Sequence, residues 1–269
     1  MPSSRLVGLI AGAGDLPLVF ARRARVEGIR LATVGLKGLT SPKLVSLSEQ
    51  FTWISLGQLG SLLSFFNKNK VSQTVIHGKV QLSSIFRSVR LDLKALSLWI
   101  RMKDRSGESI LKNLADELAR NGTKVLDGRY LMTDYLAIKG CLTKTSPDKK
   151  TIVDITLGLS KARSLARAGI GQVLAIKQGT VVAVEAVEGT DETIHRAGHW
   201  SGPGIILIKT ASPKQDWRFD VPTIGLKTIE GLAKAKAKGL VLESGKSFLL
   251  NREKAVALSN RTGMFILSV

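Results

Sequence analysis

Apolar positions in the first half of the chain fall into short runs that alternate with helix-like stretches. The runs are brief and bounded by Gly, Pro or polar residues, which is typical of buried strands. These strand candidates are residues 5–11, 31–34, 51–56 and 74–77. Between and after them, helical spacing covers 18–27 and 59–69, and 82–121 reads mostly as helix. Strands alternating with helices predict a parallel sheet with helices on both faces, a Rossmann-like arrangement.

The second half combines the same two periods in a different order and predicts a mixed α/β domain. A helical pattern at 152–168 precedes two apolar runs, 172–177 and 181–187. These runs flank Gln178-Gly179-Thr180, which is a hairpin signal. Later strand candidates are 205–209, 240–242, 247–250 and 265–269, and later helix candidates are 226–238 and 253–261.

The stretch 144–150 separates these two patterns. It is polar and contains a proline, which is typical of a linker. A chain of 269 residues is long enough for one large domain or two small ones. We therefore expect an α/β protein with an N-terminal domain at 1–145 and a C-terminal domain at 146–269.

Charge narrows the choice of partners. The chain has 40 Lys and Arg residues against 21 Asp and Glu residues, a formal net charge of +19. Such an excess favours nucleic acid, an anionic membrane surface or a phosphate-bearing substrate, or it is a solvated basic surface. Zinc-finger spacing and RNP-type aromatic motifs are missing from the sequence, which argues against nucleic acid.

Residues 85–102 repeat apolar side chains at helical spacing among basic ones. A basic amphipathic helix can lie on an anionic membrane, or it can pack its apolar face in a core. The sequence has neither a signal-peptide pattern nor a membrane-spanning run. Cys141 is the single cysteine, so an intrachain disulfide is excluded and a reducing compartment is expected. We therefore expect a cytoplasmic protein that can touch a membrane.

Two glycines follow the first strand candidate. Gly12 and Gly14 would let the backbone approach a diphosphate at the start of the next helix. A dinucleotide fingerprint would have a third glycine where Pro17 stands, which argues against a nicotinamide or flavin cofactor. A nucleotide-diphosphate site and a plain structural turn both stay open. Lys79 follows the fourth strand, where it could meet a phosphate or lie on the surface.

Two acidic stretches, 184–191 and 214–225, stand out in this basic chain. Each follows an apolar run and places carboxylates before a helix-like segment. Clustered carboxylates suggest a bound cation or general-base chemistry, and helix caps or surface ion pairs are the alternative. His195 and His199 are four residues apart, a spacing that suits either a metal or an ordinary polar helix face.

These landmarks together resemble one family, the LpxI-type UDP-2,3-diacylglucosamine pyrophosphatases of lipid A biosynthesis. The matching motifs are residues 8–17, 78–80, 170–172, 183–191, 196–198 and 215–225, in order along nearly the whole chain. The chain departs from the family pattern at Gly169, where Asp is common, and at His195, where a basic residue is usual. Residues 104–109 follow the family's acidic pattern only loosely.

The resemblance implies a nucleotide-binding domain at 1–145 and a catalytic, lipid-binding domain at 146–269. It implies hydrolysis at the α-phosphate to UMP and 2,3-diacylglucosamine 1-phosphate, with Mg²⁺ as a divalent cofactor. Asp220 matches the family's essential aspartate, and we expect Asp191 to share the catalytic role. The expected metal ligands are Asp220, Asp191 and Glu188. The expected substrate-binding residues are Gly12, Ala13, Gly14, Asp15, Lys79, Gln172, Thr190, Lys209, Gln215, Arg218 and Thr223.

The implied partners are the UDP-sugar lipid, its products and the anionic inner-membrane surface, with no nucleic acid. We expect a cytoplasmic enzyme that is peripheral at the inner face of the inner membrane. A homodimer is left open. The alternative function is a non-catalytic nucleotide-sugar or lipid-binding protein on the same fold, which would tolerate loss of Asp220.

Overall fold

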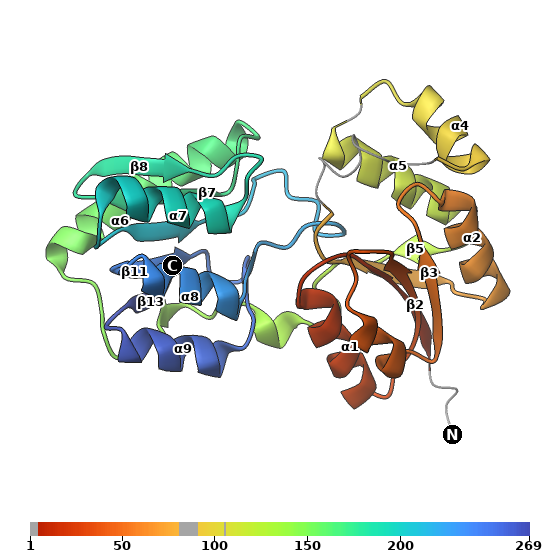
Figure 1. Ribbon diagram of the computed structural model, residues 1–269, viewed down its shortest axis with the longest axis horizontal. Coiled ribbons are helices and arrows are strands. Elements are labelled where there is room, and N and C mark those ends of the chain that lie inside the picture. Colours follow the sequence, from red (N-terminus) through yellow and green to blue (C-terminus); the bar gives the residue numbers. More distant parts are fainter. Residues whose placement is uncertain (1–4, 81–90, 105) are drawn as a thin grey trace. The chain divides into compact units, whose positions relative to one another are not determined.

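The computed structural model describes residues 5–80, 91–104 and 106–269 (Figure 1). The chain forms two compact units. The N-terminal unit comprises Met1–Met132 and Trp217–Asp220, and the C-terminal unit comprises Thr133–Asp216 and Val221–Val269. The chain therefore returns to its first unit for four residues before it completes the second.

The N-terminal unit is built on a five-stranded sheet in the order β3-β2-β1-β4-β5. All of its neighbouring strands pair in parallel. The strands are β1 (Leu6–Ala11), β2 (Arg30–Leu36), β3 (Gln50–Ile54), β4 (Gln73–His77) and β5 (Lys124–Val125). The helices are α1 (Leu16–Val26), η1 (Pro42–Leu47), α2 (Leu59–Lys68), α4 (Leu93–Arg101) and α5 (Gly107–Arg120). This strand order confirms the predicted Rossmann-like sheet.

Helices cover both faces of this sheet, which is why its inner strands are buried along nearly their whole length. Ala32, Val34 and Leu36 of β2 pack in one cluster with apolar residues of α2 and α5. Phe20 of α1 is fully buried on the other face. Figure 1 shows α1 on one side of the sheet and α2 and α5 on the other.

The C-terminal unit is built on a mixed six-stranded sheet in the order β6-β13-β11-β9-β7-β8. Its centre, β9, β11 and β13, is parallel, and β6, β7 and β8 pair antiparallel. These strands are β6 (Gly140–Cys141), β7 (Val173–Lys177), β8 (Thr180–Val184), β9 (Ile206–Lys209), β11 (Gly239–Leu242) and β13 (Phe265–Ser268). A separate parallel pair joins β10 (Thr223–Ile224) to β12 (Phe248–Leu249). The mixed α/β domain and the β7–β8 hairpin are as predicted.

The C-terminal unit has three layers, with the sheet between two layers of helices. The helices are η2 (Thr133–Tyr135), α6 (Lys149–Arg167), α7 (Thr190–Ser201), α8 (Leu226–Lys234) and α9 (Arg252–Arg261). Buried residues of α7, α8 and α9 form one cluster with the sheet, and those of α6 form another cluster with the opposite side chains of the same strands. Leu207 and Ile208, neighbours on β9, belong to different clusters because successive strand residues point to opposite faces.

The division into units differs from the boundary expected at residue 145. The stretch 144–150 lies within the C-terminal unit, because β6 before it pairs with β13 through Cys141 and Leu267. Its polar character has a local cause, since Asp148 caps α6 by accepting a hydrogen bond from the Thr151 backbone N–H at 2.7 Å. The second difference is that Trp217–Asp220, expected in the C-terminal domain, groups with the N-terminal unit.

Candidate functional site

The glycine turn after β1 lies against the end of β4. The N–H of Gly12 donates to the His77 carbonyl at 2.8 Å, and Ala13 exchanges two backbone hydrogen bonds of 2.9 Å with Lys79. A Cβ on Gly12 would lie 2.8 Å from the Lys79 carbonyl oxygen, so glycine is needed for this close approach. The sheet order is β3-β2-β1-β4-β5, so the chain goes from β1 to β2 on one side and later adds β4 on the other side. Open α/β sheets bind ligands at this position, between β1 and β4.

The turn offers fewer donors to a phosphate than the sequence suggested. The N–H groups of Gly12 and Ala13 are already bonded to β4 and to the residue after Gly78. Gly14 and Asp15, by contrast, are exposed at the start of α1. Gly14 has a φ of +94°, a conformation that favours glycine, and a Cβ there would meet no atom within 4 Å. A phosphate at this turn would therefore contact Gly14, Asp15 and the helix start.

His77 ends β4 beneath this turn. Its ring is buried and lies 5.0 Å from the ring of Phe20. Burial removes water from the imidazole and lowers its pKa from 6.5 to about 4, so the ring is neutral at pH 7. Its Nε2 atom has no hydrogen-bond partner among the described residues.

In the C-terminal unit, four polar residues meet at one edge of the sheet. The carboxyl ends of β8 and β9 and the amino end of β7 lie together there, because β7 runs antiparallel to both neighbours. Lys209 Nζ donates to Thr190 Oγ1 at 3.4 Å, and Thr190 in turn donates to Glu185 Oε1 at 2.6 Å. The Gln172 backbone N–H donates to the other oxygen of Glu185 at 3.3 Å. We call Gln172, Glu185, Thr190 and Lys209 the strand-end cluster.

The strand-end cluster places a cation where water is scarce. Lys209 is only 7% exposed and Thr190 only 5%. A buried ammonium is costly unless it is hydrogen-bonded and paired, so such groups occur where an anion is bound or a fold depends on them. A cation and a carboxylate at the carboxyl ends of strands form an arrangement that can orient an anionic ligand.

The loop after β9 is tied to this edge at two points. Gln215 Oε1 accepts hydrogen bonds from Gln172 Nε2 at 3.2 Å and from the Ser212 backbone N–H at 3.0 Å. The buried carboxylate of Glu243 accepts from the Ala211 N–H at 2.9 Å and from Arg163 at 2.9 Å. These bonds fix the loop that leads to Trp217 and Asp220.

Asp191 and Glu188 each have basic partners of their own. Asp191, in the first turn of α7, lies 3.0 Å from Lys227 Nζ and 3.4 Å from Thr228 Oγ1, both on α8. Glu188 accepts hydrogen bonds from the Ala186 N–H at 3.1 Å and from Arg196. Its own backbone N–H and the charge of Arg196 hold the pKa of Glu188 below its usual range.

The segment Trp217–Asp220 is anchored in the N-terminal unit by its aromatic residues. The Trp217 carbonyl accepts a hydrogen bond from the Gly128 N–H at 2.6 Å, and the guanidinium of Arg129 lies 4.3 Å from the centre of the Trp217 ring. Phe219 packs against the main apolar cluster of that unit. Asp220 itself is exposed and precedes the buried Val221, outside any helix, where Pro222 favours an extended backbone for the residue before it.

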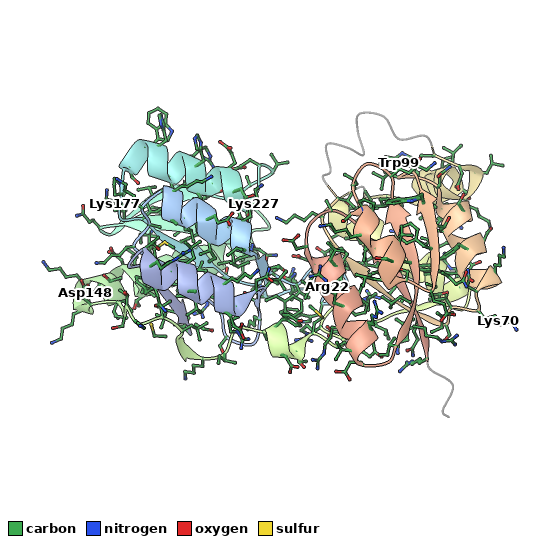
Figure 2. The ribbon with its side chains drawn as sticks, turned by 60° about the horizontal axis from the view of Figure 1, so that its bottom comes forward. Arg22, Lys70, Trp99, Asp148, Lys177 and Lys227 are labelled. Carbon is green, nitrogen blue, oxygen red and sulfur yellow. The ribbon has the colours of Figure 1, made fainter. Side chains whose placement is uncertain are left out.

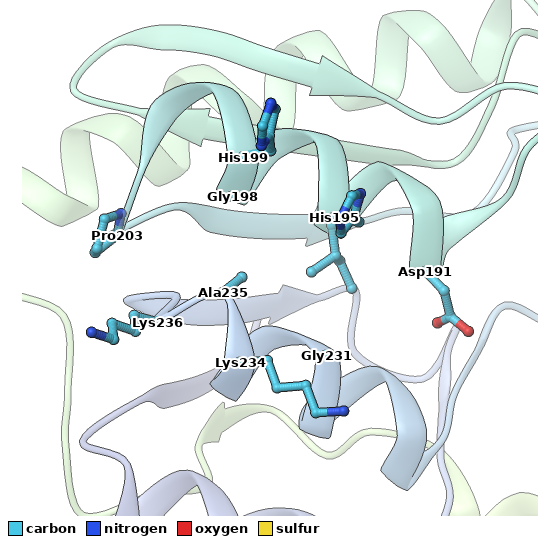
Figure 3. A pocket seen from close by; sticks show the side chains of 10 residues that line it. Asp191, His195, Gly198, His199, Pro203, Gly231, Lys234, Ala235 and Lys236 are labelled. Carbon is cyan, nitrogen blue, oxygen red and sulfur yellow. The ribbon is translucent and has the colours of Figure 1, made fainter.

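A shallow pocket of about 440 Å³ lies between α7 and α8 (Figure 3). His195 and His199 line it from α7, and Lys234 and Lys236 line it from the other side. The two imidazole rings are nearly parallel, with centres 6.4 Å apart. Asp191 lies at one end of the pocket.

Comparison with known proteins agrees with this two-unit arrangement. The model of the LpxI N-terminal domain matches residues 6–135, and that of the LpxI C-terminal domain matches residues 138–267. The chain belongs to the LpxI family. The expected family and fold class are thereby confirmed, and the two matches meet close to the change of unit after Met132.

A curated relative of this LpxI family member is the UDP-2,3-diacylglucosamine pyrophosphatase LpxI of Caulobacter vibrioides. It is 29% identical, and the match covers 98% of each chain. Among solved structures, the biotin carboxylase subunit of pyruvate carboxylase is 12% identical, with a TM-score of 0.27 over 68% of this chain and 38% of that one. The biotin carboxylase domain of Hydrogenobacter thermophilus 2-oxoglutarate carboxylase is 10% identical, with a TM-score of 0.27 over 73% of this chain and 42% of that one. Because both TM-scores are far below 0.5, we draw no conclusion about fold or function from these two structures.

Apart from Asp191 and Glu188, the predicted LpxI site residues lie in four places. Gly12, Ala13, Gly14, Asp15 and Lys79 lie at the turn of the N-terminal unit. Gln172, Thr190, Lys209 and Gln215 lie at the strand-end edge of the C-terminal unit. Arg218 and Asp220 lie on the anchored segment, and Thr223 begins β10, where its hydroxyl donates to the Val221 carbonyl at 2.7 Å.

Sequence reasoning missed Glu185. It belongs to the acidic motif 183–191, in which Glu188 and Asp191 were the expected site carboxylates. A signal was available, because Glu185 directly follows a strand whereas the other two lie in the turn and the next helix. A Cβ on Gly171 would come within 2.0 Å of the Glu185 carbonyl oxygen, so Gly171 is required beside it.

The part of the chain that the structure describes does not form a metal centre from protein side chains alone. Within residues 5–80, 91–104 and 106–269, no group of three or more His, Cys, Asp or Glu side chains could hold an ion. The carboxylates of Asp191 and Glu188 form ion pairs with Lys227 and Arg196, respectively. His195 and His199 do lie on one helix, as their spacing allowed, but a third ligand is missing from the described part of the chain.

Proposed function

We propose that this protein hydrolyses UDP-2,3-diacylglucosamine at the α-phosphate, as a step of lipid A biosynthesis. The match of both LpxI domain models, over residues 6–135 and 138–267, carries the proposal. The polar residues support it, because cationic and amide side chains stand at strand ends, where α/β folds bind anionic ligands.

In the proposed reaction, a water oxygen bonds to the α-phosphorus as the bond from that phosphorus to the bridging oxygen breaks. The bridging oxygen leaves with the β-phosphate, so the products are UMP and 2,3-diacylglucosamine 1-phosphate, with a proton released. Phosphoanhydride hydrolysis is catalysed mainly by neutralising phosphate charge and by placing the attacking water in line.

Several residues have side chains suited to these tasks. Lys209, Lys79 and Arg218 can neutralise phosphate oxygens. Gln172 and Thr190 hold Lys209 and Glu185 in place through the strand-end cluster. We assign Asp220 the task of accepting the proton of the attacking water or orienting that water, because it is an exposed carboxylate on an anchored segment.

Mg²⁺ remains a proposal drawn from the resemblance. Mg²⁺ is commonly held by one or two carboxylates together with substrate phosphates, and such an ion needs no prior cluster on the protein. Since Asp191 and Glu188 are occupied by basic partners, we assign no step of the hydrolysis to an ion at those residues.

The deciding experiment measures UMP release from UDP-2,3-diacylglucosamine in detergent micelles prepared with ¹⁸O-labelled water. Attack at the α-phosphorus puts the label in UMP, and attack at the β-phosphorus puts it in the sugar phosphate. Label in the sugar phosphate would overturn the proposed site of attack. Failure to release UMP, with tight binding of the substrate, would favour the non-catalytic binding protein.

A further inference from the structure

Helix α4 has an unusual position in its unit. None of its nine residues, all in the described part of the chain, is buried. It is held at its start, where Asp92 accepts hydrogen bonds from the Ala95 N–H at 2.9 Å and from the Gly60 N–H of α2 at 2.7 Å. Figure 1 shows α4 beyond α2 and α5, away from the sheet.

The two faces of α4 differ. Ala95 and Leu98 pack against the apolar cluster of the N-terminal unit. Leu93, Leu96 and Ile100 point the other way and are 86%, 42% and 70% exposed. These three residues are spaced i, i+3, i+7 and so form one line along the helix, which we call the α4 stripe. An isolated exposed leucine is ordinary, but an aligned group of three marks a contact surface.

Basic and aromatic residues border the α4 stripe. Lys94 and Arg101, seven residues apart, are exposed along one flank. Trp99, labelled in Figure 2, is half-buried one turn from Leu96 on the other flank. The helix contains no Asp or Glu. An apolar line with Lys and Arg beside it and a Trp at its edge is the pattern of a helix that lies in a membrane interface.

Charge decides between an anionic bilayer and a second copy of this chain as the occupant. The chain carries a net charge of +19, so two copies repel each other, whereas an anionic lipid surface attracts it. Helix α6 also exposes apolar residues, Val153 among them, but Asp154 stands beside it and five other residues of α6 are buried. The α4 stripe is therefore the better candidate for contact with anionic lipid.

We propose that the α4 stripe docks the N-terminal unit on an anionic bilayer. Leu93, Leu96 and Ile100 would enter the boundary between headgroups and acyl chains, and Lys94 and Arg101 would meet lipid phosphates. The inference rests on the proposed function, since a substrate with two acyl chains resides in a bilayer. Of the two roles left open for the helix expected at 85–102, the proposal assigns membrane contact and not core packing. Residues 85–90 of that expected helix lie outside the described residues.

The test is co-sedimentation of the full-length protein with vesicles of phosphatidylcholine, with and without phosphatidylglycerol. Binding should require phosphatidylglycerol and weaken as salt rises, because screening shortens to about 8 Å near physiological ionic strength. Leu93→Ser combined with Ile100→Ser should weaken binding by about tenfold or more, since it removes most of the inserted apolar surface. Lys94→Glu combined with Arg101→Glu should weaken it similarly. Val153→Ser, the matched control on α6, should bind as the wild type does.

Trp99 provides a local probe of insertion. Brominated lipid should quench part of the tryptophan fluorescence in the wild type, and Trp99→Phe should remove that quenched part. UMP release in detergent micelles does not need a bilayer, so both double variants should retain it. This separates failure of docking from failure of the proposed hydrolysis.

Three results would overturn the docking proposal. Unchanged vesicle binding of both double variants is one, and equal loss of binding in Val153→Ser is another. The third result is that the wild-type protein forms dimers without lipid while the variant with both Leu93→Ser and Ile100→Ser is monomeric. In that case a second copy of the chain would cover the α4 stripe.

Discussion

Among single residues, Asp220 stands between two packed neighbours in the sequence. Asp220 is exposed, follows the packed side chain of Phe219 and precedes the buried Val221. Its backbone is therefore fixed on both sides while its carboxylate is accessible to water, as a catalytic acid or base requires.

We expect Asp220→Asn to lower kcat by about two orders of magnitude or more, the scale of a lost general base. Substrate affinity should remain, because the proposed phosphate contacts are Lys209, Lys79 and Arg218, not Asp220. Asp216→Asn, four residues earlier, is the local control and should have a smaller effect. The measurement is kcat and KM for UMP release, and near-normal turnover by a folded Asp220→Asn variant would refute this role.

His77 makes a separate prediction about pH. Its pKa is about 4 in the folded protein against 6.5 for an ordinary histidine, so the unfolded state binds more protons between these values. The contribution of His77 to the free energy of unfolding should therefore be fully present above pH 6.5. It should fall as the pH drops toward about 4, by roughly 3 kcal/mol in total. Urea unfolding across this range measures the loss. His77→Gln should flatten the profile, and the exposed His199→Gln should leave it as in the wild type.

Among elements, strand ends decide where the polar residues meet. Gln172 precedes β7, Glu185 follows β8, and Lys209 ends β9. They are close only because β7 runs antiparallel to both neighbours, which brings its start to the same edge as their ends. The first turn of α7 adds Thr190 between Lys209 and Glu185.

Replacing the acceptor of this cluster should have two effects. Glu185→Gln keeps the shape but removes the charge that accepts from Thr190 and from the Gln172 N–H. We expect a stability loss of about 1–3 kcal/mol, the cost of disturbing a hydrogen bond to a charged group. We also expect a higher KM, since Lys209 would lose its orientation. Glu192→Gln, an exposed change nearby on α7, should alter neither quantity. Thermal unfolding and steady-state kinetics test both, and unchanged values for Glu185→Gln would remove the cluster from the site.

For the whole molecule, the path of the chain matters most. It leaves the N-terminal unit after Met132, returns at Trp217 and leaves again after Asp220. Phe219 secures this return by packing on the apolar cluster of the N-terminal unit. The segment with the predicted catalytic aspartate is therefore fastened to one unit although most of its sequence neighbours belong to the other.

Phe219→Ala should reduce both stability and kcat. Removal of a partly buried phenylalanine should cost about 1–3 kcal/mol, somewhat less than for a fully buried one. Phe65→Ala is the matched control, because Phe65 is also partly buried against the same cluster but lies on α2. Both variants should lose similar stability, and only Phe219→Ala should lower kcat. Equal kcat in the two variants would mean that Phe219 does not position Asp220.

The sequence alone determined the order and type of most elements and the family. Period-two and helical patterns are local, so they located β1 to β4, α6 and the β7–β8 hairpin within a few residues. The close pairing of Gly12 with the end of β4 was not visible, although its glycines were, because that contact joins segments 65 residues apart. Two-residue strands such as β5 and β6 were missed, since two residues carry no period.

Tertiary structure alone decided which polar residues are partners and which surfaces are exposed. The boundary after Met132, the return of Trp217–Asp220 and the ion pairs of Asp191 and Glu188 all depend on contacts between distant segments. The helix at 93–101 could have been a core helix or a surface helix by its pattern, and only the packing of α2 and α5 leaves Leu93 and Ile100 outside. A periodic pattern states that a helix has an apolar face, but the remainder of the fold determines what that face meets.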